Sequence, residues 1–259
     1  ALMKLMWRRM RIANIGLEKF RQEYPSNAME SFVVSGNNIF DLELIQSRLN
    51  FVDDTPKLEL PKKLPPIFRK WKNSITIWKY PEKGKKYYGG VDTGEGIGSD
   101  NSVISIVDEE GFQCLEFSNN RIKPYEFSEL VREVGLYYNT CLLVIEKLSA
   151  GHTVVDKLYD SSNRYINLYK YRQYDSKGKM RKKPGFETSS KSRPIIINRF
   201  VELFEKGEVC INSKGLLNEM KSFQMDNNGK VQAVSGAKDD RVLAFCMALE
   251  GISSGLYYI

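Results

Sequence analysis

Four acidic side chains stand where predicted strands end or a predicted helix begins. Asp92 closes the strand YYGGVD, Glu146 closes the apolar run CLLVIE, and Asp239 and Asp240 open a long apolar helix. Each acid alone could fix a turn, follow a core strand or cap a helix. Strand ends and a helix start can also meet at one edge of a sheet, where clustered carboxylates repel one another unless a cation neutralises them. The four positions together therefore predict a cation site.

The sequence restricts the kind of cation. The chain has one histidine, His152, and four cysteines that are far apart and form no CxxC pair, so a zinc site is not expected. Oxygen ligands alone select Mg²⁺ or Mn²⁺. A glycine-rich loop follows Asp92 and would leave room beside it for a metal and a phosphate. Asp100, at the end of that loop, is either an auxiliary ligand or a turn acid, and His152 is expected on a surface or in helix packing.

Positive charge is concentrated in one segment. Residues 170–193 hold nine Lys or Arg and two acids, an excess that equals the net charge of +7 of the whole chain. Tyrosine and phenylalanine are interspersed with these basic residues. A concentrated basic patch with aromatic residues indicates a polyanionic partner, although a solvated basic loop has the same composition.

The elements that must position these residues belong to a mixed α/β fold. Strands are predicted at 87–92, 102–110 and 112–120, joined by short turns, followed by a helix over 124–139 and a buried strand over 141–147. Further helices are predicted at 149–162, 191–207, 215–226 and 239–255, and further strands at 74–80, 166–174, 208–212 and 230–236. Three sequential strands followed by alternating strands and helices indicate a mixed sheet with helices on its faces.

The first third of the chain has a different composition. Residues 1–52 are predicted to be helical, with Leu5, Met6 and Met10 on one apolar face and a second short helix after a break at EYPSNAMESF. Residues 53–70 are rich in proline and lysine and are predicted to be a linker, which leaves 71–259 as the α/β domain. No window is apolar enough to span a membrane. The chain begins with Ala rather than Met and has no signal peptide, so we expect a fragment of a longer protein.

Several of these segments together resemble a known family. An Asp on the first strand, a three-strand meander, a Glu on the fourth strand and an Asp at a late helix start are similar to the RNase H-like superfamily. More narrowly, YYGGVDTGEGIGSDNSVISIVD, LLVIEKLSAG, GFETSSKSRPIIINRFVELFEKGEVCI and KDDRVLAFCMAL resemble the nuclease domain of the tailed-bacteriophage terminase large subunit. FRQEYPSNAMESFVVSGNNIFD resembles the end of the ATPase domain of that protein. No Walker A motif is present, so the ATPase site is not expected in this chain.

The resemblance implies an RNase H-like nuclease that cuts concatemeric double-stranded DNA with two Mg²⁺ or Mn²⁺ ions. In that scheme Asp92 bridges the ions, Glu146 holds one, and Asp239 or Asp240 holds the other. A basic hairpin from Tyr174 to Phe186 would grip the DNA backbone. The expected DNA contacts are Lys177, Lys179, Arg181, Lys182, Lys183, Lys191 and Arg193. Lys238, beside the acidic pair, would contact the scissile phosphate or remain solvated.

The implied partners are double-stranded DNA, the portal protein, the small terminase subunit and the ATPase domain of the full-length chain, in the host cytoplasm and without a membrane. GVDTGEG also resembles the phosphate turn of actin-like ATPases and sugar kinases, but the second such turn that they need is missing. The N-terminal segment argues against a Holliday-junction resolvase or a transposase. A non-catalytic DNA-binding or capsid-docking module remains open, and metal dependence would separate it from a nuclease.

Overall fold

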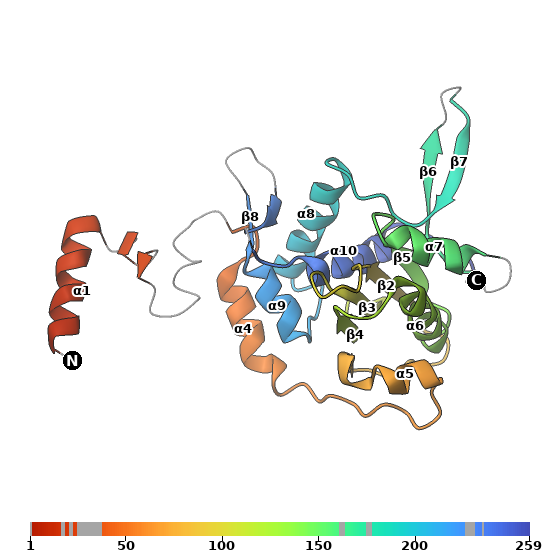
Figure 1. Cartoon of the computed structure of the whole chain (residues 1–259), viewed down its shortest axis with the longest axis horizontal. Helices are drawn as coiled ribbons and strands as arrows, with labels where there is room; N and C mark the ends of the chain where they lie inside the picture. Colours follow the sequence, from red (N-terminus) through yellow and green to blue (C-terminus); the bar gives the residue numbers. More distant parts are fainter. Residues whose placement is uncertain are drawn as a thin grey trace.

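A five-stranded mixed sheet forms the centre of the molecule, with strand order β1-β4-β3-β2-β5 (Figure 1). The computed structural model describes residues 2–16, 19–20, 23–24, 38–160, 164–174, 178–225, 231–234 and 236–259. The strands of the sheet are β1 (Ile75–Ile77), β2 (Tyr87–Asp92), β3 (Ser102–Asp108), β4 (Gln113–Asn119) and β5 (Leu142–Ile145). The first four pair antiparallel, and β5 pairs parallel with β2. The predicted fold class, a meander plus a parallel strand with flanking helices, is confirmed.

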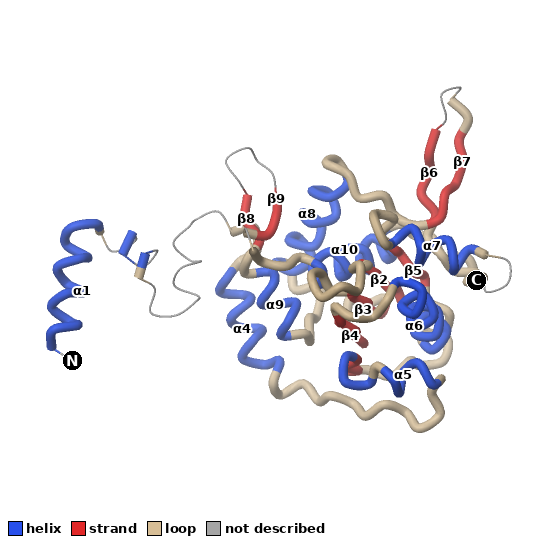
Figure 2. The backbone as a smooth tube through the Cα atoms, viewed as in Figure 1, coloured by secondary structure: helices blue, strands red, loops and turns tan. Residues whose placement is uncertain are grey.

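Helices cover both faces of this sheet, which makes three layers (Figure 2). One face packs against α5 (Pro66–Lys70), α6 (Pro124–Tyr137) and α7 (Gly151–Tyr159). The other packs against α8 (Ser192–Glu205), α9 (Lys214–Met220) and α10 (Asp240–Ser253). Because every residue of β2, β3 and β5 is buried, these strands have the nearly continuous apolar sequences typical of a covered sheet.

Helix α10 lies directly on β2. A Cβ atom at Gly90 would stand 1.8 Å from the carbonyl oxygen of Ala244, so only glycine allows this approach. Side chains alternate along a strand, and Asp92 therefore lies on the same face as Gly90, toward α10. The start of α10 is thereby brought to the end of β2.

The N-terminal part contributes to the same core. Helix α1 (Leu2–Ile15) leaves Leu5, Met6 and Met10 exposed, whereas α4 (Leu42–Val52) packs beside α9. The ring centroid of Phe40 lies 5.0 Å from that of Phe200, and Arg48 Nε donates to the carbonyl oxygen of Ile211 at 2.6 Å. The division at residues 52 and 70 stays a prediction. Residues 38–52 nevertheless contribute apolar side chains to one of the two cores.

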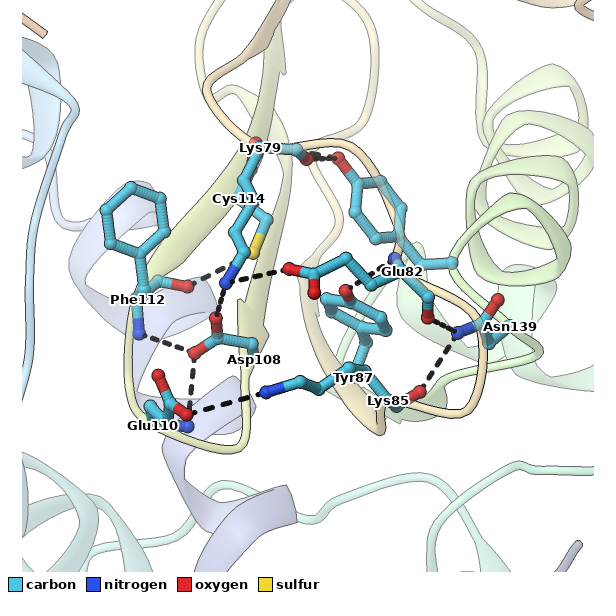
Figure 3. A network of polar contacts seen from close by, with 10 residues as sticks. Lys79, Glu82, Lys85, Tyr87, Asp108, Glu110, Phe112, Cys114 and Asn139 are labelled. Atoms are coloured by element: carbon cyan, nitrogen blue, oxygen red, sulfur yellow. Dashed lines mark hydrogen bonds and ion pairs between the residues drawn. The ribbon is translucent and has the colours of Figure 1, made fainter.

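A polar network fastens the sheet at the end opposite Asp92 (Figure 3). Asp108 accepts hydrogen bonds from the backbone N–H groups of Glu110 and Phe112 at 3.1 and 2.9 Å, and its other oxygen pairs with Lys79 Nζ at 2.9 Å. Asn139 Nδ2 donates to the carbonyl oxygens of Glu82 and Lys85. The Lys79–Asp108 pair ties the segment before β2 to the β3–β4 turn, and Asn139 ties the same segment to the residues after α6. We assign these contacts a structural role.

Two smaller hairpins complete the fold: β6 (Lys170–Tyr174) with β7 (Met180–Pro184), and β8 (Phe223–Met225) with β9 (Val231–Ala233). The sequence prediction was wrong in two places here. The expected strand 208–212 is only a bridge between Phe112 and Cys210, and the expected helix 215–226 ends at Met220 because β8 follows. The second short helix predicted after EYPSNAMESF lies outside the described residues. No helix of the described part is long and apolar enough to cross a membrane.

Candidate metal centre

The predicted acidic residues line one pocket. Asp92, Asp100, Glu146, Asp239 and Asp240 all border a cavity of about 300 Å³ at the end of β2. They come from two strand ends, the loop after β2 and the start of α10. Residues separated by up to 148 positions in the chain are therefore neighbours, as the sequence predicted.

Strand pairing explains how Asp92 and Glu146 meet. Val91 pairs with Ile145 in the parallel register of β2 and β5, and the Glu146 N–H donates to the carbonyl oxygen of Val91 at 3.0 Å. The next residue of each strand then lies on the same face of the sheet. Both side chains are buried, at 8% exposure for Asp92 and 7% for Glu146.

Burial and neighbouring acids make Asp92 a poor anion in the absence of a cation. Burial is the main cause that raises its pKa well above the ordinary value, followed by repulsion from Glu146, a side-chain hydrogen bond with Glu146, and repulsion from Asp240 and Asp239. Asp92 therefore retains a proton more readily than an isolated aspartic acid would. A divalent cation would relieve the same repulsion.

Asp240 is held by Asn101, a residue that the sequence patterns did not single out. The backbone N–H and the Nδ2 of Asn101 donate to Asp240 Oδ2 at 2.9 and 2.8 Å. Burial raises the pKa of Asp240, and these two hydrogen bonds partly offset that rise. The only sequence signal was the position of Asn101 just before β3, at the edge where Asp92 ends β2.

Asp239 differs from a sequence prediction: its alignment with the apolar face of the last helix predicts that its side chain points toward the sheet. It precedes α10 with φ −131° and ψ 3°, outside the helical period on which the expectation relied, and its side chain is 31% exposed. The carboxylate makes no capping hydrogen bond. It instead accepts a hydrogen bond from Arg193 Nη2 of α8. Asp240 is the buried member of the pair, at 6% exposure.

The donor set fits a hard divalent cation, since every titratable group that lines the pocket, apart from Arg193, is a carboxylate. In the part of the chain that the structure describes, no group of three or more Asp, Glu, His or Cys side chains is arranged to hold a metal ion as it stands. Asp239 and Asp240 are each engaged by another side chain. Thr93 Oγ1, beside Asp92, is buried without a hydrogen-bond partner. The residues that would bind the ion are thus gathered but not yet directed at one point.

The glycine loop borders the pocket beside Asp92 and is also tied to a neighbouring segment. Of its three alternate glycines, only Gly94 lines the pocket. Gly96 adopts φ +70°, and its carbonyl oxygen accepts a hydrogen bond from Lys123 Nζ at 3.0 Å. Gly98 pairs with Asn120 through its N–H at 2.9 Å. The loop is fastened to the segment after β4 rather than left open.

The basic segment forms the predicted hairpin, β6 and β7, which projects from the body of the molecule (Figure 1). Lys179, Arg181, Lys182 and Lys183 are exposed on it, and Lys177 lies outside the described residues. The hairpin is anchored next to the pocket: the N–H of Phe186 donates to the carbonyl oxygen of Ile145, and the N–H of Lys147 donates to that of Phe186, both at 2.7 Å. These two bonds flank Glu146, so the base of the hairpin is joined to the strand that carries this acid.

The remaining predicted residues are divided between the pocket and the surface. Arg193 lines the pocket, whereas Lys191 is exposed where α8 begins. Lys238 Nζ donates to the carbonyl oxygen of Ser99, which joins the start of α10 to the glycine loop. His152 is exposed on α7 and does not line the pocket, as expected for a surface residue.

A family model described as the terminase RNaseH-like domain matches residues 89–251. Similar solved structures include the large terminase nuclease of thermophilic phage G20c with bound magnesium, at 18% identity and a TM-score of 0.58 over 83% of this chain and 97% of that one. The same nuclease with bound cobalt gives a TM-score of 0.57, also at 18% identity and the same coverage. The large terminase nuclease domain of Thermus phage P74-26 gives 0.52, at 17% identity over 82% of this chain and 98% of that one. With its five-stranded mixed sheet and a family match over more than half its length, the chain belongs to the terminase RNaseH-like domain family.

Proposed function

We propose that this domain is a Mg²⁺- or Mn²⁺-dependent endonuclease that cuts concatemeric double-stranded DNA during viral genome packaging. The observation that carries the proposal is the convergence of Asp92, Glu146, Asp239 and Asp240 on one cavity, with Asp100 at its edge. The related nucleases were solved with bound magnesium and cobalt, which supports a divalent cation here.

Each acid has a distinct part in the proposal. Asp92, which is repelled by each of the other three acids, would bridge two ions. Glu146 would hold one ion, and Asp239 with Asp240 would hold the other. When bound, the ions would activate water and stabilise the leaving oxygen of the phosphodiester. Asn101 would keep Asp240 in one orientation through its two hydrogen bonds. The exposed Lys and Arg side chains of the hairpin would hold the DNA backbone without reading the DNA sequence.

Plasmid cleavage in Mn²⁺ tests the proposal. Asp92→Ala and Glu146→Ala should each lower the cleavage rate by about a hundredfold or more, since each removes a proposed metal ligand. Glu59→Ala, an acid exposed elsewhere on the surface, is the matched control and should cleave at the wild-type rate. Full activity in both pocket variants would refute the proposed active site.

The alternative, a DNA-binding or capsid-docking module without catalysis, makes the opposite prediction. It would bind DNA equally well in EDTA and in Mn²⁺ and would leave the plasmid intact. The repulsion at Asp92 argues against a purely structural role, because a scaffold gains nothing from clustered buried carboxylates. Portal protein, small subunit and the ATPase domain of a full-length chain are the proposed partners, in the host cytoplasm.

A further inference from the structure

Arg193 and Asp239 form the wall between two cavities. Both residues line the acidic pocket, and both also line a neighbouring cavity of about 360 Å³ beside β9. The guanidinium Nη2 of Arg193 donates to Asp239 Oδ2. Their side chains are 25% and 31% exposed, so the pair is only partly screened by solvent.

The position of Arg193 is fixed by the turn before α8. Ser189 Oγ accepts the N–H of Ser192 at 3.1 Å, Ser192 Oγ donates to the carbonyl oxygen of Glu187 at 2.9 Å, and the N–H of Arg193 donates to the carbonyl oxygen of Ser189 at 3.0 Å. These three bonds hold the backbone at Arg193 in place. Within the guanidinium group, Nε is buried and has no hydrogen-bond partner. The contact with Asp239 thus leaves Arg193 incompletely satisfied.

The pair has a direct consequence for cation binding. The Asp239 oxygen that accepts from Arg193 cannot offer the same lone pair to a metal, and the positive charge of Arg193 repels a divalent ion nearby. We propose that Arg193 competes with the divalent cation for Asp239 and, once displaced, contacts a DNA backbone phosphate. This inference rests on the proposed nuclease function.

A phosphate is the expected second partner of Arg193. Among the described residues that line the neighbouring cavity, Asp239 is the sole acid, so a displaced guanidinium finds no other carboxylate there. The planar fork of arginine matches a phosphate with two parallel hydrogen bonds. Metal binding and DNA contact would then be linked, because the ion releases Arg193 from Asp239 and Arg193 then holds the DNA strand.

Mn²⁺ binding without DNA, measured by the electron paramagnetic resonance of free Mn²⁺, tests the competition. Arg193→Gln should bind Mn²⁺ roughly tenfold more tightly than wild type, because a competing charge has been removed. Arg193→Lys, which keeps the charge, should stay within about threefold of wild type. Arg199→Gln is the matched control: Arg199 also pairs α8 with α10, through Glu250, but does not line the pocket, and its removal should leave Mn²⁺ affinity unchanged.

Plasmid cleavage at saturating Mn²⁺ tests the phosphate contact. Arg193→Gln should cut at least about tenfold more slowly despite its tighter metal binding, and this opposite pair of effects is not expected from a merely structural residue. Suppose that Mn²⁺ binding by the wild-type pocket is lost when Asp92 is replaced, but that a folded Arg193→Gln variant binds Mn²⁺ no more tightly than wild type. This result would overturn the inference about Arg193 and leave the proposed function standing. Wild-type protein that shows no Asp92-dependent Mn²⁺ binding would instead overturn the proposed function.

Discussion

Asp92 combines two properties that rarely coincide in a residue kept only for stability. It is almost fully buried, and its nearest charged neighbours carry the same sign. Burying a carboxylate among carboxylates costs free energy unless a proton or a cation compensates. The protein supplies compensation for Asp239, through Arg193, and for Asp240, through Asn101. Among the residues that the structure describes, neither a cation nor an amide donor pairs with the carboxyl group of Asp92 or Glu146, which is why we place the ion beside them.

Replacing Asp92 by Asn should stabilise the metal-free protein. The folded-state pKa of Asp92 is raised above its unfolded value of about 3.9, so the folded state holds the proton more tightly and its stability falls as pH rises above that value. Asn cannot ionise and avoids this loss. In EDTA the melting temperature of Asp92→Asn should exceed that of wild type, by about 2–4 °C for each kcal/mol recovered, with the difference greater at pH 8 than at pH 5.

The same melting measurements with Mn²⁺ separate charge relief from a general effect on the fold. Mn²⁺ should raise the melting temperature of wild type and leave that of Asp92→Asn nearly unchanged, because a ligand that binds only the folded state stabilises it. Asp54→Asn, at an exposed acid between α4 and α5, is the control and should behave as wild type throughout. A melting temperature for Asp92→Asn equal to or below wild type at every pH in EDTA would contradict the account.

Sequence patterns predicted the helices and strands that have a clear apolar periodicity. They failed for structure that depends on contacts between separate elements. The apolar runs of β2, β3 and β5 were found because both faces of these strands are buried. The convergence of Asp92 with Glu146 followed from their places at strand ends. The strand β8 was missed because its three residues continue an apolar helical pattern, and its pairing with β9 is a contact between separate segments of the chain. The role of Asn101 could not be predicted, since it depends on where α10 packs.

Arg241 shows how the start of α10 is held from the opposite side. Its guanidinium lies between Glu116 of β4 and Glu219 of α9, at 3.2 and 2.7 Å, and its backbone N–H donates to Glu219 at 2.8 Å. Burial raises the pKa of both carboxyls, and Arg241 opposes that rise. The residue next to Asp240 is therefore fastened to two other elements.

Arg241→Met should destabilise the fold by about 3 kcal/mol at neutral pH, because it leaves two mostly buried carboxylates without their cation. Without Arg241 the folded-state pKa values of Glu116 and Glu219 rise further above the unfolded value of about 4.3. The folded state then binds more protons than the unfolded state. The free energy of unfolding therefore falls as pH rises from the unfolded pKa to the raised folded-state pKa. Urea unfolding should thus show a smaller loss at pH 5 than at pH 7.5.

A neutral version of the same cluster is the control for Arg241→Met. Adding Glu116→Gln and Glu219→Gln removes the two unpaired charges, so the triple variant should be more stable than Arg241→Met at pH 7.5 and should lose the extra pH dependence. A loss for Arg241→Met that is identical at both pH values would show that packing of the side chain, not charge, accounts for the effect.

Across the whole molecule, charge is separated along the sheet. The basic hairpin is joined to β5 beside Glu146, at the end where Asp92 lies. Near the other end of the sheet, a groove of about 560 Å³ has more acidic than basic lining residues: four glutamates border it, together with Arg199 and Lys206, each of which pairs with a glutamate. The four are Glu109, Glu110, Glu202 and Glu208. DNA attracted to the basic end and repelled from the acidic end would approach the metal pocket first. The orientation of the substrate then follows from the charge distribution and needs no base-specific contact.

Replacing the exposed Lys and Arg residues of the hairpin by Ala tests this orientation. The variant Lys179→Ala, Arg181→Ala, Lys182→Ala should bind duplex DNA more weakly, and the slope of log K against log[salt] should become shallower by up to about 0.9 for each phosphate that is no longer neutralised. A matched triple variant, Lys57→Ala, Lys62→Ala, Lys63→Ala, removes the same charge from exposed positions between α4 and α5 and should retain the wild-type slope. Fluorescence anisotropy in the presence of Ca²⁺ measures DNA binding by both variants between about 50 and 200 mM salt. Over this range, the DNA affinity of a protein that contacts phosphates changes strongly. If the two triple variants have equal slopes of log K against log[salt], net charge alone attracts DNA. The hairpin would then have no part in guiding the strand to the pocket.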